Sequence, residues 1–115
     1  MPNNQKKGQW AEEQAVTFLL TAGYTIIERN WRCIYGEIDI VAQDGDIWVF
    51  VEVRARHHLD DAFASITSSK REKMIHSAHS YLQKLPLDTP WRVDMIAVAW
   101  GPPLQIQHVE DILAW

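Results

Sequence analysis

The chain has 115 residues, of which 47% are hydrophobic and 23% charged, and its formal net charge is −4. This length and composition predict one globular domain over residues 1–115. An acidic net charge is atypical of proteins that coat nucleic acid, whose domains are usually basic. Positive charge is concentrated locally, because the stretch from Arg54 to Lys84 has six Lys or Arg residues against three acids.

Cysteine content and hydropathy indicate the cellular compartment in which the protein is expected. Cys33 is the single cysteine of the sequence, which excludes an internal disulfide and a zinc cluster built on cysteine. This composition suits a reducing compartment, so we expect a cytoplasmic protein with Cys33 as an ordinary strand residue. Residues 1–7 are polar, so we expect them to be frayed rather than to form a signal peptide. No apolar run is long enough to span a membrane, so no membrane partner is expected.

The first predicted element is a helix over residues 8–22, because apolar side chains recur there at helical spacing and Gly23 follows as a stop signal. A strand is expected next, from Tyr24 to Cys33. Glu12 lies beside the apolar stripe of the helix. Two interpretations stay open: Glu12 is a first-turn acid that suits the helix dipole, or it leans over the sheet and joins a functional site.

Residues 36–41 and 48–54 predict a β-hairpin, because Asp44-Gly45 between alternating hydrophobic residues is a strong turn signal. With Asp44-Gly45 as a two-residue loop, side-chain alternation brings Glu37, Asp39 and Glu52 onto one face. The cross-strand pairs expected for this loop are Gln43 with Asp46, Val41 with Trp48, Asp39 with Phe50 and Glu37 with Glu52.

Three neighbouring carboxylates repel one another unless a positive charge compensates them. A divalent metal is the natural compensation, and oxygen ligands from Asp39 and Glu52 suit Mg²⁺ or Mn²⁺ better than zinc. Such an ion polarises a phosphodiester oxygen and activates water, which is the chemistry of nucleases. Arg54 lies two residues after Glu52 on the same face, where its charge would point at the same site.

The next predicted helix begins at a capping box, Ser69 to Glu72, after a polar loop over residues 57–63. Histidines and acids in that loop, His57, His58, Asp60 and Asp61, resemble metal ligands but are expected to be solvated. One face of the helix is apolar and the other is basic, which fits either a solvated surface or one that faces phosphates. The polar face contains Lys70, Lys73, His76, Ser77, Ser80 and Lys84.

The remaining elements complete an α/β pattern. Pro86 ends the helix, a strand is predicted over residues 91–100, and residues 101–103 form a turn. An edge strand over residues 104–107 and a closing helical turn over residues 109–115 follow. The predicted order is therefore a helix, three strands, a helix and one or two strands, with helices covering a central mixed sheet.

The segments Gly36-Glu37-Ile38-Asp39 and Phe50-Val51-Glu52-Val53-Arg54, with Arg56 after them, resemble the signature of the YraN-like bacterial proteins. These are predicted endonucleases, similar to archaeal Holliday-junction resolvases. The resemblance implies a restriction-endonuclease-like fold of the PD-(D/E)xK type, a three-layer core in the order α-β-β-β-α-β-β. Further matches cover most of the chain: Gly8 with Glu12, Gly23-Tyr24, Asn30 with Arg32, Thr67 with Lys70, and Arg92 with Asp94.

The resemblance also implies roles for single residues. Asp39 and Glu52 would bind the metal with the Val53 carbonyl, Glu12 would be a further acid on the helix, and Glu37 would assist them. The expected contacts to nucleic acid are Arg32, Arg56, Lys70 and Lys73.

Arg54 occupies the place of the motif's lysine. Arginine keeps its proton, so Arg54 can stabilise a charged phosphate but is a poor base. Lys70 on the following helix is a candidate for the missing ammonium group.

Three hypotheses follow. The first is a Mg²⁺-dependent nuclease acting on DNA, including branched DNA, as a homodimer if two symmetric sites are needed. The second is a nucleic-acid-binding domain that keeps the fold but has lost turnover through Arg54. The third is a structural or partner-binding protein, for example a dimer that forms through tryptophan-rich surfaces, with Trp10, Trp31 and Trp115 near the ends of elements.

Overall fold

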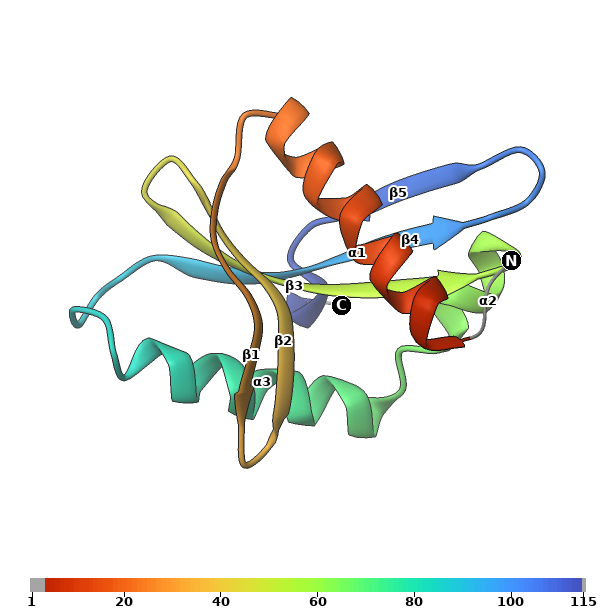
Figure 1. Cartoon of the computed structure of the whole chain (residues 1–115). Helices are drawn as coiled ribbons and strands as arrows, with labels where there is room; N and C mark the ends of the chain where they lie inside the picture. The colour runs from red at the N-terminus through yellow and green to blue at the C-terminus, as the bar shows by residue number, and fades with distance from the viewer. Residues whose placement is uncertain (1–3, 115) are drawn as a thin grey trace.

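The computed structural model describes residues 4–114 and consists of a β-sheet with helices on both faces (Figure 1). The elements in chain order are α1 (Asn4–Thr21), β1 (Thr25–Cys33), β2 (Gly36–Asp44), β3 (Ile47–Arg56), α2 (Leu59–Ala64), α3 (Ser68–Leu82), β4 (Trp91–Ala99), β5 (Gln105–Val109) and the 3₁₀ helix η1 (Ile112–Ala114).

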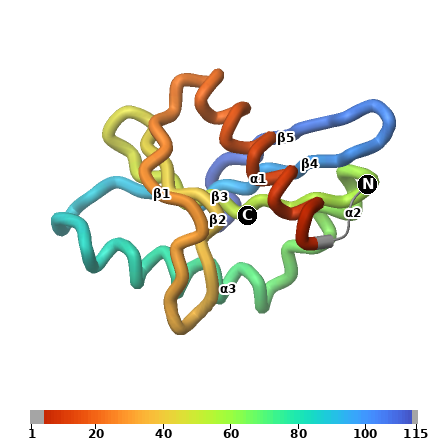
Figure 2. Tube along the Cα trace, viewed as in Figure 1, coloured from red at the N-terminus to blue at the C-terminus, as the bar shows by residue number. Residues whose placement is uncertain are grey.

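The five strands lie in the order β1-β2-β3-β4-β5. Strands β3 and β4 are parallel, while the other three neighbouring pairs are antiparallel. The parallel pair requires a crossover, which α2 and α3 provide, as the path of the chain in Figure 2 shows. The sheet is therefore mixed, as the sequence predicts.

Each face of the sheet has its own apolar core. Ala11, Ala15 and Leu19 recur every four residues along α1 and pack on one face, against residues such as Val49 and Ile96. On the opposite face, α2 and α3 cover a second set of buried side chains. This set includes Val41, Phe50, Ala62, Met74, Ala78, Tyr81, Val93 and Met95. Helix, sheet and helix thus form the predicted three-layer α/β arrangement.

The turn between β2 and β3 differs from its prediction. The observed pairs Gln43–Trp48 and Asp44–Ile47 place the two-residue loop at Gly45-Asp46, not at Asp44-Gly45. Gly45 has φ 61°, a conformation that glycine adopts without steric cost and that this turn requires. The predicted pairs are wrong by two residues, a shift that preserves side-chain alternation along the paired residues 40–44 and 47–51. Beyond this ladder the alternation is broken, because Ile38 packs in the core beneath α3 and Ile40 in the core beneath α1.

Four smaller predictions also need correction. Residues 4–7 are helical, and residues 1–3 lie outside the described part of the chain. Residues 59–64 form helix α2 rather than a loop, because Leu59, Ala62 and Phe63 follow helical spacing and pack on the core. The cap of α3 is Thr67, whose Oγ1 accepts a hydrogen bond from the Lys70 N–H at 3.1 Å, and not Ser69. The same helix ends at Leu82, ahead of Pro86.

The later strands agree with their predictions. Strand β4 follows the predicted span closely, and β5 is the expected edge strand, although it extends to Val109. The closing helical turn is the short helix η1, and Trp115 lies outside the described residues. No helix within residues 4–114 is long and apolar enough to cross a membrane.

Candidate metal site

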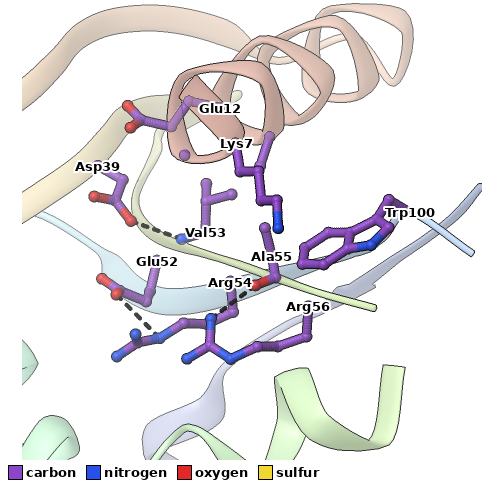
Figure 3. Close-up of a pocket in the computed structure, with 11 residues that line it drawn as sticks. Lys7, Glu12, Asp39, Glu52, Val53, Arg54, Ala55, Arg56 and Trp100 are labelled. Atoms are coloured by element: carbon purple, nitrogen blue, oxygen red, sulfur yellow. Dashed lines mark hydrogen bonds and ion pairs between the residues drawn. The ribbon is translucent and has the colours of Figure 1, made fainter. Parts of the chain in front are cut away.

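A polar cavity of about 550 Å³ opens where β3 passes beneath the first turns of α1 (Figure 3). The predicted acids Asp39 and Glu52 lie at one end of this cavity, and Trp100 forms the opposite wall. The lining residues are Lys7, Gly8, Ala11, Glu12, Asp39, Glu52, Val53, Arg54, Ala55, Arg56 and Trp100.

Asp39 lies where β2 and β3 separate. The ladder between these strands runs from Asp44–Ile47 to Ile40–Val51, and beyond it the Val53 N–H donates a 2.8 Å hydrogen bond to Oδ2 of Asp39. The side chain thus replaces a backbone acceptor. Burial, followed by the negative charge of Glu52, raises the pKa of Asp39 to about 8, and the acids Glu12 and Glu37 contribute in the same direction.

Glu52 is a buried carboxylate, with only 6% of the residue exposed. Two cations approach the same oxygen, Oε1: Lys70 Nζ at 3.2 Å and Arg54 Nε at 3.4 Å. Burial raises the pKa of Glu52, and the charges of Lys70 and Arg54 oppose this rise. Glu52 is therefore not an exposed residue on a solvated face of the sheet.

Lys70 enters the site from a separate layer. It lies in the first turn of α3, and its backbone N–H is bound by the Thr67 cap, which fixes the start of the helix beside β3. Both Lys70 and Arg54 are largely buried, with 29% and 21% of their side chains exposed. The site therefore has an ammonium and a guanidinium group, both within 3.5 Å of one carboxylate oxygen.

Arg54 is held without a hydrogen bond at its inner nitrogen. Nε is a buried atom that makes no hydrogen bond with the described residues, although it lies 3.4 Å from Glu52. A buried donor without an acceptor costs free energy, so Arg54 is held there by its charge beside Glu52 rather than by a hydrogen bond. Because the guanidinium cannot lose its proton, it can contribute only positive charge and hydrogen bonds.

Asn30 joins two further acids at the edge of the site. Its Nδ2 donates to Oε1 of Glu12 at 2.6 Å and to Oε1 of Glu37 at 2.7 Å. Asn30 has φ 52°, and Asn is one of the residues that adopt this left-handed conformation most readily. Glu12 therefore leans toward the sheet, as one of the two interpretations predicted, and it also lines the cavity with Asp39.

The predicted basic contacts lie around the acids. Arg56 lines the cavity and donates to the Ala55 carbonyl at 2.7 Å. Arg32 is exposed beyond Glu37, and its Nε lies 3.5 Å from Oε2 of that acid. Lys73 is exposed on α3 and shares a smaller hollow with Lys70 and Glu37. Basic side chains thus flank the site on two sides.

Some sequence-based expectations are not met, and some lining residues were missed. Ser77 is buried rather than solvated on α3. His57 and His58 are exposed, as expected, and contact each other outside the cavity lining. Lys7 and Trp100 were not predicted to belong to the site. A tryptophan placed between a buried strand and a Gly-Pro-Pro turn was the available signal for Trp100, whereas Lys7 gave none.

The donor set fits a hard divalent cation. Asp39 and Glu52 offer carboxylate oxygens and Glu12 adds a third acid nearby, which is the ligand chemistry of Mg²⁺ and Mn²⁺. The raised pKa of Asp39 indicates that this acid lacks a compensating cation of its own. Asp39 and Glu52 would hold the ion, with Glu12 beside them.

A second cluster of polar side chains lies in the sheet, where an arginine already balances the negative charge of the buried acid. Asp94 is fully buried and accepts from Arg92 Nε at 3.0 and 3.2 Å and from the Asp111 N–H at 2.9 Å. His108 Nε2 is 2.7 Å from Asp94, and Arg92 also reaches Glu110 at 3.3 Å. Asp94, His108 and Glu110 are close enough to suggest metal ligands, but the Arg92 guanidinium supplies the positive charge there.

The fold and the cavity define a class: an α/β protein with a carboxylate pair at the point where two strands of a mixed sheet separate. The sequence profile of Uncharacterised protein family UPF0102 matches residues 11–98, and the chain belongs to this family. The expected membership of an uncharacterised bacterial family is therefore confirmed.

Relatives match along most of their length. A UPF0102 protein of Roseiflexus castenholzii is 46% identical over 91% of this chain and 88% of its own. A UPF0102 protein of Nitrosomonas eutropha is 44% identical over 96% of this chain and 98% of its own. A third, from Chloroflexus aurantiacus, is 46% identical over 85% and 83%. These names state no activity.

Proposed function

We propose that this protein is a metal-dependent nuclease that hydrolyses phosphodiester bonds of nucleic acid, with DNA as the substrate and Mg²⁺ or Mn²⁺ as the cofactor. The observation that carries this proposal is the meeting of Asp39 and Glu52, from two strands, at one cavity, with Lys70 of helix α3 lying 3.2 Å from Glu52. The three-layer fold and the order of its elements support a restriction-endonuclease-like protein. The sequence signature from Gly36 to Arg56 supports the same class.

Each group in the cavity suits a part of the reaction. When bound, Mg²⁺ polarises a phosphoryl oxygen and activates water. Asp39 and Glu52 would hold this ion, and Lys70 would stabilise the negative charge that builds up when a water oxygen bonds to phosphorus. Arg54 would bind a non-bridging phosphate oxygen through its fixed positive charge. The ester bond to the leaving oxygen breaks as the new bond forms; the attacking water loses its proton to solvent and the leaving oxygen takes one up from solvent, which yields two shorter strands.

The basic side chains around the cavity suit a strand that extends past the reacting phosphate. Arg56 is the inner contact, and Arg32 and Lys73 are exposed enough to meet flanking phosphates. The acidic net charge of −4 suits a protein whose positive charge is confined to one site. We further propose a homodimer acting in the cytoplasm, because symmetric cutting of a branched duplex requires two sites.

The test is a cleavage assay with labelled single-stranded, duplex and four-way-junction DNA in Mg²⁺ or Mn²⁺. Wild-type protein should give metal-dependent products, and the near-isosteric variant Asp39→Asn/Glu52→Gln should give none. Asp46→Asn is the matched control, since it removes an exposed acid in the hairpin turn. Equal products from the wild type and the double variant would trace the cleavage to a contaminant and refute the proposal.

A domain that binds nucleic acid without cutting it is the competing function. Arg54 at the lysine position favours it, because arginine is a poor base. Salt-sensitive DNA binding without products in either metal would select this alternative. The position of Lys70 beside Glu52 is the observation that favours the nuclease instead.

A further inference from the structure

Trp100 is fixed at the wall of the cavity opposite the carboxylates (Figure 3). It follows β4, where its backbone N–H donates to the Arg56 carbonyl at 3.2 Å, and the Gly101 N–H donates to the His57 carbonyl at 3.3 Å. These bonds continue the pairing of the two parallel strands past their ends. Trp100 therefore lies at the carboxyl edge of a parallel pair, a position where ligands commonly bind in α/β proteins.

A lysine lies over one face of the indole ring. Lys7 Nζ, from the first turns of α1, lies 4.5 Å from the ring centroid, and the His57 ring meets the indole nearly at right angles at 5.9 Å. Trp100 is half-buried, as is Lys7. A cation over an aromatic face is held by the ring's quadrupole, and the lysine stem is flexible enough to move. A planar group could therefore displace the lysine and lie on this face of the indole.

The space beside the ring suits a nucleotide. The cavity of about 550 Å³ falls within the range of roughly 300–1,000 Å³ that is typical of small-molecule sites. Gly8 leaves its wall open, since a Cβ built there would meet nothing within 4 Å. Arg54 and Arg56 also line the cavity. A phosphate at these guanidinium groups would bring its attached base toward Trp100.

We infer that Trp100 is a stacking platform for one unpaired nucleobase of the strand being cut, next to the reacting phosphate. This inference rests on the proposed nuclease function and adds a substrate class to it. A base inside a duplex is covered on both faces by its neighbours, so only an unstacked base can lie on the indole. The preferred substrates are therefore single strands and branch points, and the displaced Lys7 ammonium moves to a phosphate.

A purely structural role for the same contact makes a different prediction. If Lys7 and Trp100 only fasten α1 to the sheet, replacing Trp100 lowers stability and weakens binding of every substrate alike. If Trp100 is instead a stacking platform, replacing it weakens binding only of strands that have a base at the stacking position.

The test is a thermodynamic cycle between protein and substrate. Single-stranded DNA of about 12 nucleotides, intact or with an abasic site moved along the strand, is titrated against wild-type protein, Trp100→Leu and Trp100→Phe. Binding is followed by fluorescence anisotropy in Ca²⁺, with gels to verify that the strand stays intact. We expect an abasic site at one position to weaken wild-type binding by about tenfold. Trp100→Leu should show no such loss, and Trp100→Phe should retain part of it.

The other outcomes overturn the inference in distinguishable ways. If Trp100→Leu weakens binding equally for intact and abasic strands, or has no effect, the stacking role fails while the nuclease proposal stands. If the wild type neither binds nor cuts any strand in Mg²⁺ or Mn²⁺, both proposals fail. Thermal melts of both Trp100 variants, without DNA, separate a loss of folding from a loss of stacking.

Discussion

Lys70 Nζ lies 3.2 Å from Oε1 of Glu52, so an ammonium group from helix α3 reaches a carboxylate on strand β3. The PD-(D/E)xK motif supplies its lysine from the acid's own strand, and this chain has Arg54 at that position. Lys70 and Arg54 approach the same oxygen atom. In the proposed nuclease, the positive charge that phosphodiester chemistry requires would thus come from another element of the fold.

Replacing Lys70 should therefore impair cleavage strongly. We expect Lys70→Gln to lower kcat by about 100-fold, because a preorganised charge beside the reacting group is lost. Lys70→Arg should recover part of that loss if charge alone matters. The measurement is single-turnover cleavage, with Arg29→Gln as a control that removes a cation from an ion pair with Glu13 outside the cavity. A smaller loss for Lys70→Gln than for Arg29→Gln would contradict this role.

Asp39→Asn should stabilise the metal-free protein, and more so at high pH. The folded-state pKa of Asp39 is about 8, against an ordinary 3.8. Between these values the folded state holds the extra proton, so the free energy of unfolding falls as pH rises from about 4 to about 8. Asparagine removes this penalty and still accepts from the Val53 N–H. Urea unfolding in EDTA should show a gain of about 2 kcal/mol at pH 9 and a smaller gain at pH 5.

An equal gain at both pH values would instead mean that Asp39 titrates normally in the folded protein. Asp46→Asn, in the exposed turn, is the matched control and should change the free energy of unfolding by less than about 0.5 kcal/mol.

Mg²⁺ should stabilise the folded protein through the same two acids. A ligand present at 100 times its Kd raises the free energy of unfolding by about 2.7 kcal/mol. This gain should vanish in Asp39→Asn/Glu52→Gln and grow from pH 6 to about pH 9, because the Asp39 proton competes with the ion. Thermal melts with and without Mg²⁺ measure this stabilisation by the ion. A gain that persists in the double variant would place the ion elsewhere.

Arg92 should prove structural rather than catalytic. Arg92→Met leaves the fully buried Asp94 without its main counter-charge, and removing one partner of a buried pair costs about 3 kcal/mol or more. Arg29→Met breaks the more exposed pair with Glu13 and should cost less than about 1 kcal/mol. Urea unfolding at pH 7 compares the two. Equal losses would mean that Arg92 contributes no more than a surface ion pair.

The carboxylate pair was predictable from sequence because strand alternation tolerates an error of two residues. The turn lies at Gly45-Asp46 instead of Asp44-Gly45, yet Asp39 and Glu52 still line one cavity. An error of one residue would have separated them. The three-layer order was likewise predictable, since each helix and strand has a distinct hydrophobic period.

Contacts between layers were not predictable to the same degree. The link from Asn30 to Glu12 and Glu37 depends on a left-handed residue within a strand, which no local pattern indicates. Lys7 lies in a segment whose sequence predicts fraying, but its packing on Trp100 belongs to the tertiary structure. The approach of Lys70 to Glu52 depends on where the Thr67 cap starts α3, whereas the sequence pattern predicted a cap at Ser69.

The hydrogen bond from the Val53 N–H to Oδ2 of Asp39 gives one oxygen of this carboxylate a structural role and leaves the other oxygen without that role. Oδ2 completes the backbone of a forked sheet. A cation at the proposed metal site would bind through the other oxygen, Oδ1, and would enter or leave without any change in strand pairing. We expect the free and metal-loaded proteins to share one backbone, so that loading the site requires side-chain rearrangement alone.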